Sequence, residues 1–203
     1  SGPDWEMDPE VVSDPRYAGT LTDDLLAVPS ISVVMDWDDL WAGGGQGIYI
    51  AGEADPRAAS FERITADGTR TFQENGSIQI QGQSSTGRWK TNKLSLRAKF
   101  TEAYGPSKLR ARLFEDSPVE AFDTFVLDAV LNLSWLHPSS AQRGPAQYVQ
   151  DQVVADLQNL GGGRAPHGSY VHLYLNGVYW GMYYLHERPD GGVHQSYAGG
   201  GKD

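Results

Sequence analysis

The feature that most constrains the fold is the segment of residues 170–190, YVHLYLNGVYWGMYYLHERPD. Two apolar runs flank Asn176-Gly177, a pair that favours the tight turn of a β-hairpin. In the first run apolar residues alternate with His172 and Tyr174, and in the second run both faces are largely apolar. Because strands without a polar face are covered on both sides, the hairpin is predicted to be central in a sheet.

Other segments predict a sheet with a single main helix. Strands are expected at residues 31–35, 60–72 (a hairpin about Asp67-Gly68), 76–83, 93–100, 107–114 and the start of 122–136. Residues 36–41 predict a short helix, and residues 42–52 a glycine-rich loop that leads into a strand. Residues 144–163 carry the clear helical pattern, with apolar residues at three and four spacing and glycines at the end. The fold class is therefore α+β, mainly an antiparallel twisted sheet.

The chain is expected to form one domain with two extensions. Residues 1–27 are acidic, interrupted by prolines, and predicted to be irregular; residues 28–190 form the domain; residues 191–203 form a glycine-rich tail. The 24 glycines and 11 prolines among 203 residues favour a sheet over a helical bundle. No stretch approaches the roughly 20 apolar residues of a membrane span, and no signal peptide is recognised.

The charge is unevenly distributed. The net charge of −10 argues against non-specific nucleic-acid binding, yet residues 88–112 carry +7 and the remainder −17. Along residues 93–100, Lys93, Ser95, Arg97 and Lys99 share one strand face, and Lys108, Arg110 and Arg112 repeat the pattern. These basic ridges indicate either a site for a compact anion or a solvated face.

The sequence does not match the familiar catalytic and binding motifs in full. HERPD begins like a zinc-protease helix, but Asp190 occupies the place of the second histidine. The five histidines are scattered, which disfavours a histidine metal site, and the absence of cysteine excludes a thiolate site or a cysteine nucleophile. The glycines at residues 42–52 lack the third position of the dinucleotide fingerprint, where Ile50 stands. No hydrolase constellation is present either.

A small polar loop, followed by a predicted strand that carries a lysine, indicates a phosphate-binding site more clearly. Residues 82–87, GQSSTG, offer backbone N–H groups and hydroxyls to phosphate oxygens, and Lys93 follows on a strand. Kinases hold the α- and β-phosphates of ATP with a strand lysine near such a loop.

These residues resemble a known family. GQSS, KLSLRAKF, AYGPSKLRARLF, FDTFVL, YVQDQVVADL and the 170–190 hairpin resemble, in order and spacing, the CotH family of spore-coat-protein-H-like atypical kinases over about residues 28–200. The resemblance implies a fold like the N-lobe of an atypical kinase. It also implies ATP with Mg²⁺ or Mn²⁺ as cofactors, a protein substrate or coat partner, and a secreted or coat-associated location.

The resemblance also assigns candidate site residues. Lys93 matches the family's strand lysine, and Asp151 the helix acid expected to balance it; these are the candidate catalytic residues. Ser84 and Ser85 match the serine pair of the phosphate loop. The segment His186, Glu187 and Arg188 falls at the hinge along which adenine would lie, although a structural ion pair of Glu187 and Arg188 is an equal alternative.

Three departures from the family pattern stand near the expected phosphates. Asp128 and Gln150 occupy positions where the family usually has arginine, and Gln83 replaces an asparagine. Each lost charge-assisted hydrogen bond removes roughly 1.5–3 kcal/mol. HRD and DFG motifs are also absent, so the chain alone is expected to bind nucleotide but not to be a complete kinase. The alternative is a non-catalytic secreted module that binds a protein or polysaccharide through its basic ridges.

Overall fold

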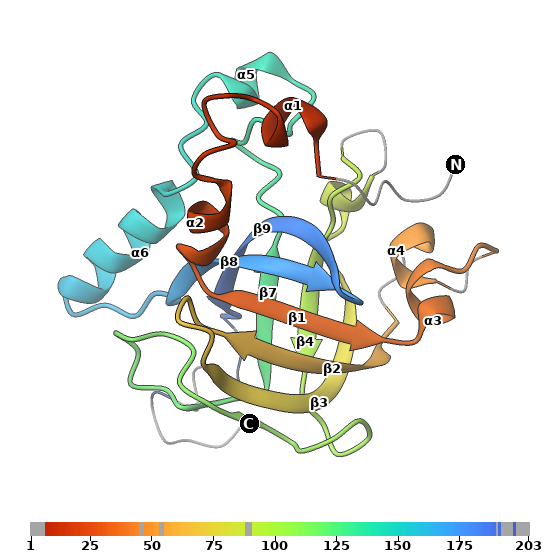
Figure 1. Ribbon diagram of the computed structural model, residues 1–203. Coiled ribbons are helices and arrows are strands. Elements are labelled where there is room, and N and C mark those ends of the chain that lie inside the picture. The colour runs from red at the N-terminus through yellow and green to blue at the C-terminus, as the bar shows by residue number, and fades with distance from the viewer. Residues whose placement is uncertain are drawn as a thin grey trace.

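The core of the structure is a closed β-barrel (Figure 1). The structure is a computed structural model that describes residues 7–44, 47–52, 55–87 and 91–189 together with Gly191 and Tyr197. Seven strands follow one another around the barrel in the order β1-β2-β3-β4-β7-β9-β8. Neighbours pair in antiparallel fashion except β1 and β8, whose parallel pairing of Ser30 with His172 and Val33 with Leu175 closes the barrel.

The strands come from all parts of the described chain. The barrel strands are β1 (Ser30–Met35), β2 (Arg57–Ile64), β3 (Arg70–Gln81), β4 (Ser95–Lys99), β7 (Thr124–Asp128), β8 (Gly168–Leu175) and β9 (Val178–Glu187). A separate two-stranded sheet joins β5 (Leu109–Arg110) to β6 (Ala121–Phe122). The turn between β8 and β9 has positive φ at Asn176 (49°) and Gly177 (82°), as the Asn-Gly pair predicts.

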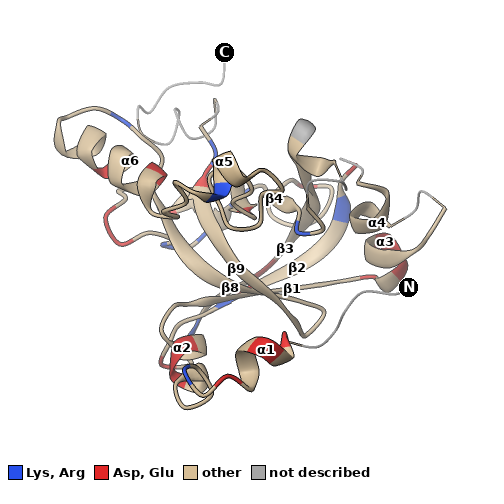
Figure 2. Ribbon diagram, turned by 90° about the horizontal axis from the view of Figure 1, so that it is seen from above, with Lys and Arg blue, Asp and Glu red and all other residues tan. Residues whose placement is uncertain are grey.

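The helices are short and lie outside the barrel. They are α1 (Pro9–Val12), α2 (Leu21–Leu26), α3 (Trp37–Trp41), α4 (Ile48–Ala51), α5 (Ser140–Arg143) and α6 (Gln150–Leu160), with a 3-10 turn η1 (Ser84–Thr86). Figure 1 shows α3 and α4 beside the end of β1, and α2 and α6 on the other side of the barrel. Acidic residues mark α1, α2 and α3 in Figure 2.

The barrel interior is filled by alternate side chains of the strands. Ile31, Phe61, Phe125 and Leu173 are fully buried, and the rings of Phe61, Phe100 and Phe125 pack with centroids 5.7 to 5.9 Å apart. Burial of one such side chain stabilises the fold by about 1.5–3 kcal/mol. The other side chains of the strands therefore face outward, and the candidate functional residues are found among them.

The prediction of a kinase-like α+β fold with one main helix is wrong. The sheet is a closed seven-stranded mixed barrel, accompanied in the described part of the chain by six helices, most of them a single turn. The error has a physical cause, because closure depends on β1 pairing with β8, and a parallel contact so distant in sequence leaves no local pattern.

Several local predictions are confirmed and others need correction. The alternation in residues 93–100 is confirmed, since Leu94, Leu96, Ala98 and Phe100 are all buried. The strand expected at residues 107–114 is reduced to the two residues of β5. The strand expected after the glycine-rich loop is a helix, α4. The N-terminal segment, expected to be irregular, contains α1 and α2, and the predicted tail lies almost entirely outside the described residues.

Helix α6 lies within residues 144–163, where the pattern predicts a helix, but its apolar side chains do not pack inward. None of its residues is buried, and Leu157 and Leu160 are 64% and 85% exposed. The sequence pattern therefore identifies the helix correctly but not the direction of its apolar face.

Candidate functional site

Two hollows contain predicted site residues. The first, here called the polar hollow, has a volume of about 250 Å³ and is lined by Gln81, Gly82, Ser85, Ser95, Asp128, Val130, Leu131, Asn132, Tyr148, Asp151, Tyr170 and Tyr184. The second, here called the aromatic pocket, has a volume of about 510 Å³ and is lined by Met7, Asp8, Val11, Leu21, Asp24, Leu25, Tyr49, Asn92, Lys93, His172, Tyr179, Trp180 and Gly181.

Strand pairing sets the floor of the polar hollow. Gln81 of β3 pairs with Ser95 of β4, and Tyr184 of β9 pairs with both Asp128 of β7 and Tyr170 of β8. Paired residues point to the same side of a sheet, and here that side is the outside of the barrel. A row of polar side chains thus crosses five neighbouring strands.

Asp128 is the carboxylate of this row. Its Oδ1 accepts hydrogen bonds from the Ser95 hydroxyl at 3.0 Å and from the Val130 N–H at 2.7 Å, and the Ser95 Oγ accepts one from the Ala129 N–H at 2.9 Å. Its Oδ2 lies 4.0 Å from Nε2 of His186, and 42% of the side chain is exposed. One oxygen of Asp128 is therefore fixed by the protein, and the side chain remains partly exposed where it lines the hollow.

The start of α6 and the residues before it form the opposite wall. The Tyr184 hydroxyl donates to Oε1 of Gln152, and the Tyr170 hydroxyl donates to the carbonyl oxygen of Tyr148. Burial, followed by the nearby Tyr148, raises the pKa of Tyr170 to about 12, and burial also raises the pKa of Tyr184. Asp151 is exposed in the first turn of α6, at the edge of the hollow.

The serine loop closes one end of the polar hollow. η1 is held by the Gln83 carbonyl, which accepts hydrogen bonds from the Thr86 N–H at 3.1 Å and the Thr86 hydroxyl at 2.6 Å. Gly82 has φ +116°, and a Cβ there would lie 2.3 Å from Oγ of Ser85, so the turn requires glycine. Ser85 lines the hollow, whereas the side chain of Ser84 lies outside the described residues.

Lys93 is held against β9 and lines the aromatic pocket instead. Its Nζ donates to the carbonyl oxygen of Met182 at 2.5 Å and lies 4.4 Å from the centroid of the Tyr183 ring. Burial lowers the pKa of Lys93 to about 8, and the negative charge of Asp128 opposes this shift. Gly181 has φ +115°, which favours glycine, and a Cβ there would be in ordinary van der Waals contact with Lys93, 3.6 Å from its Cε.

Lys93 stands between the two hollows. It lines the aromatic pocket, while Ser95 on the same side of the strand lines the polar hollow. Along β9, Gly181 lines the aromatic pocket and Tyr184 the polar hollow, with the Met182 carbonyl between them. The electrostatic partner of Lys93 is Asp128, whereas no ion pair with Asp151 is formed.

The predicted hinge residues lie at the far end of β9. Glu187 is fully buried, and its carboxylate accepts hydrogen bonds from the Ser117 hydroxyl at 3.2 Å, the His167 N–H at 2.9 Å and the Tyr197 hydroxyl at 2.9 and 3.0 Å. His186 is half-buried beside Asp128, and Arg188 is half-buried. The carboxylate of Glu187 therefore serves as an anchor for surrounding segments, and it does not line either hollow.

Sequence reasoning missed the role of Asp128 and of the tyrosines. In the sequence Asp128 is only a departure from a family pattern, although it lines the polar hollow in the structure. Tyr170 and Tyr184 fit the apolar strand pattern, which gives no sign of a role for their hydroxyls. The turn alone could not reveal their pairing, because regular pairing about Asn176-Gly177 sets Tyr170 opposite Tyr183. A register shift between Leu173 and Tyr174 moves Tyr170 opposite Tyr184.

Other site types find no support in the described ranges. They contain no group of three or more histidine, aspartate or glutamate side chains placed to hold a metal ion. They also contain no helix long and apolar enough to cross a membrane.

The fold and the site define the class of protein: a β-barrel domain with two ligand-sized hollows on either side of a partly buried lysine. Residues 78–202 match the family model described as CotH kinase protein, which covers more than half of the 203 residues. The chain therefore belongs to the CotH kinase protein family, as the sequence resemblance indicates. No curated protein matches the chain.

Proposed function

We propose that this chain carries the nucleotide-binding part of a CotH-type phosphotransferase, with the phosphates bound between Lys93 and the polar hollow. The observation that carries the proposal is the position of Lys93, whose ammonium group donates to the Met182 carbonyl and interacts electrostatically with Asp128, a residue of the hollow that Ser85 also lines. The proposal concerns nucleotide binding and not turnover. From family membership we also propose a protein substrate or coat partner and a secreted or coat-associated location.

The Lys93 ammonium supports phosphate binding through its unused donors. A lysine ammonium has three N–H donors, and one of them is donated to Met182. The remaining two are available to phosphate oxygens, and a partly buried ammonium group interacts with an anion more strongly than one in water. Ser85 adds a hydroxyl donor on the far side of the hollow.

The carboxylates of the polar hollow require a divalent cation if phosphate is to bind there. Among the described residues that line it none is lysine or arginine, whereas Asp128 and Asp151 are both acidic. Carboxylate, amide and hydroxyl oxygens are the ligands that Mg²⁺ and Mn²⁺ prefer, so this set of donors fits either ion. Asp128 and Asp151 would hold the ion, which would neutralise phosphate charge; Lys93 and Ser85 would then orient the phosphate oxygens.

Thermal unfolding with ATP and Mg²⁺ tests the proposal. A ligand at about 100 times its Kd stabilises the folded state by about 2.7 kcal/mol. For a chain of this size that corresponds to a rise in Tm of roughly 5–10 °C. ATP with a chelator is expected to give little or no shift, because the two carboxylates are then uncompensated.

Two variants and one control locate the effect. Lys93→Ala is expected to abolish the ATP-induced shift, and Ser85→Ala to reduce it. Lys99→Ala is the matched control, since Lys99 is exposed on the same strand face and should leave the shift unchanged. The proposal is wrong if the wild type shows no shift with ATP and Mg²⁺, or if Lys93→Ala responds as the wild type does.

A second candidate function is a non-catalytic binding module. It is favoured by Arg110 and Arg112, which together line a hollow of about 430 Å³ and are both exposed. Neutralising Arg97, Lys99, Arg110 and Arg112 should then abolish a salt-sensitive pull-down of a protein or polysaccharide partner, while Lys93→Ala should leave it intact. Loss of the pull-down in Lys93→Ala would argue against this function.

A further inference from the structure

The aromatic pocket has a rigid aromatic wall. The centroid of the Trp180 ring lies 5.2 Å from the centroid of the Tyr49 ring, in an edge-to-face arrangement. It lies 5.0 Å from the centroid of the Trp41 ring. The Tyr49 hydroxyl accepts hydrogen bonds from Nε1 of Trp180 at 2.8 Å and from the Leu94 N–H at 3.0 Å, and donates to the Asn92 carbonyl at 3.0 Å. Every hydrogen-bonding direction of this hydroxyl is used, so the rings are fixed before any ligand arrives.

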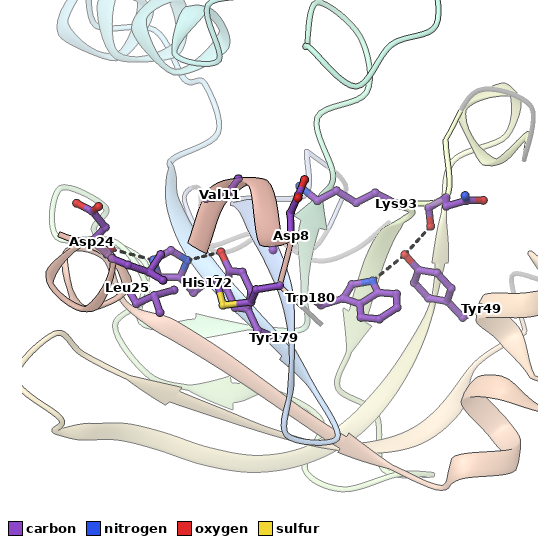
Figure 3. A pocket seen from close by; sticks show the side chains of 13 residues that line it. Asp8, Val11, Asp24, Leu25, Tyr49, Lys93, His172, Tyr179 and Trp180 are labelled. Atoms are coloured by element: carbon purple, nitrogen blue, oxygen red, sulfur yellow. Dashed lines mark hydrogen bonds between the residues drawn. The ribbon is translucent and has the colours of Figure 1, made fainter. Parts of the chain in front are cut away.

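The remaining walls are also ordered. Figure 3 shows α1 above the pocket, with Trp180 and Tyr49 on one side and His172 on the other. The His172 ring is held between the Tyr179 hydroxyl at 3.1 Å and the Asp24 carbonyl oxygen at 3.2 Å. Apolar side chains from the N-terminal helices and the residues next to them complete the roof: Met7, Val11, Leu21 and Leu25. A volume of about 510 Å³ with mainly apolar walls is typical of a small-molecule site.

One cation lies at the edge of this apolar space. The Lys93 ammonium donates one hydrogen bond, to Met182, and takes part in none of the ion pairs in the described part of the chain. Burial lowers the pKa of Lys93 to about 8, which shows that the charged form is poorly compensated there. A ligand anion that reached the two remaining N–H donors would supply the missing compensation.

The acidic groups of the pocket limit how much negative charge a ligand can carry. Asp8 caps α1 by accepting a hydrogen bond from the Glu10 N–H at 2.9 Å, and Asp24 accepts one from the Thr20 hydroxyl at 2.8 Å. Both carboxylates are therefore directed to their own segments but still line the pocket. A single anionic group beside Lys93 is compatible with them, whereas a multiply charged ligand is repelled.

We infer that the aromatic pocket binds a small aromatic molecule with one negative charge, such as an aryl carboxylate, whose ring packs on Trp180 and whose carboxylate pairs with Lys93. This site is separate from the polar hollow and does not rest on the proposed nucleotide function, although the two sites share Lys93.

Calorimetric titration with 2-naphthoate and the uncharged 2-naphthalenemethanol tests the inference. Both probes contain the same ring system, so the difference between them isolates the carboxylate. The naphthoate is expected to bind at least tenfold more tightly than the alcohol. Lys93→Met should remove this preference while keeping the weaker binding of the alcohol, and Trp180→Leu should weaken both probes. Lys99→Met, a change of an exposed lysine, should alter neither.

The pH dependence provides a second readout. Naphthoate affinity is expected to fall as pH rises above about 8, where Lys93 loses its proton, while alcohol affinity stays constant. The other titratable groups are Asp128, the electrostatic partner of Lys93, and those that face the pocket: Asp8, Asp24, His172, Tyr49 and Tyr179. Any dependence that they cause by themselves would persist in Lys93→Met.

The two proposals fail differently. Loss of naphthoate binding in Trp180→Leu with an unchanged response to ATP and Mg²⁺ supports two sites. Equal affinity for naphthoate and alcohol, no binding of either probe, or a loss of naphthoate affinity above about pH 8 that is the same in Lys93→Met as in the wild type would overturn the inference. An absent ATP response alongside selective naphthoate binding would refute only the nucleotide function.

Discussion

The Tyr49 hydroxyl is expected to contribute more to stability than its single oxygen suggests. Tyr49→Phe keeps the ring but removes the acceptor of two hydrogen bonds, from the Leu94 N–H at 3.0 Å and from Nε1 of Trp180 at 2.8 Å. A buried donor left without a partner costs about 1–3 kcal/mol. Leu94 is only 1% exposed, so its N–H should incur most of that cost, whereas Trp180 at the pocket wall can recover part of its loss from water.

The sum predicts a loss of about 3 kcal/mol in the free energy of unfolding, or roughly 6–12 °C in Tm for a chain of this length. Urea denaturation followed by tryptophan fluorescence measures it, with an unchanged m-value showing that the unfolded state is the same. Tyr17→Phe is the matched control, because this tyrosine is 42% exposed and should change stability by less than about 0.5 kcal/mol.

A loss below about 1 kcal/mol in Tyr49→Phe would refute the reasoning. It would mean that the Tyr49 hydroxyl does not link α4 to β9 and to the residues before β4 through the hydrogen bonds described. The rigid wall inferred for the aromatic pocket would then lose its support as well.

Three further outcomes are expected. Glu187→Ala should lower the free energy of unfolding by about 3 kcal/mol in urea melts, because the buried His167 N–H loses its acceptor; a near-neutral result would contradict the anchor. Gly181→Ala should cost about 1–3 kcal/mol because φ is +115°, whereas Gly19→Ala, with open space around it, should not; equal effects would count against this account. Burial lowers the pKa of Lys93 from 10.5 to about 8, so the unfolded chain binds more protons between these values. The stability of the wild type relative to Lys93→Met should therefore rise by about 1–3 kcal/mol as pH increases from 8 towards 10.5, and a flat difference would exclude a perturbed lysine.

Local patterns in the sequence predict local structure well. The Asn176-Gly177 turn and the alternation of residues 93–100 are both present, because each depends on neighbours along the chain or on one strand's inner face. Lys93, predicted to lie on a strand, precedes β4 by two residues, and its ammonium group donates to the Met182 carbonyl of β9.

What the sequence could not predict depends on distant contacts. Residues 48–51 contain two isoleucines, which favour a strand, yet they form α4 because Ile48 and Tyr49 are buried there beside Trp41 and Trp180. Asp128 was expected only to weaken phosphate binding, whereas it is the electrostatic partner of Lys93, a relation that arises only when β4 and β7 pair.

The parallel ladder between β1 and β8 has a consequence for biosynthesis. Its two strands, Ser30–Met35 and Gly168–Leu175, are among the first and the last of the barrel to leave the ribosome. Until the second has emerged, the growing chain can form only an open sheet whose edge hydrogen-bonding groups are unpaired. Nascent chains should therefore associate with one another or recruit chaperones during this interval, and the newly made protein becomes resistant to aggregation only when the seam closes.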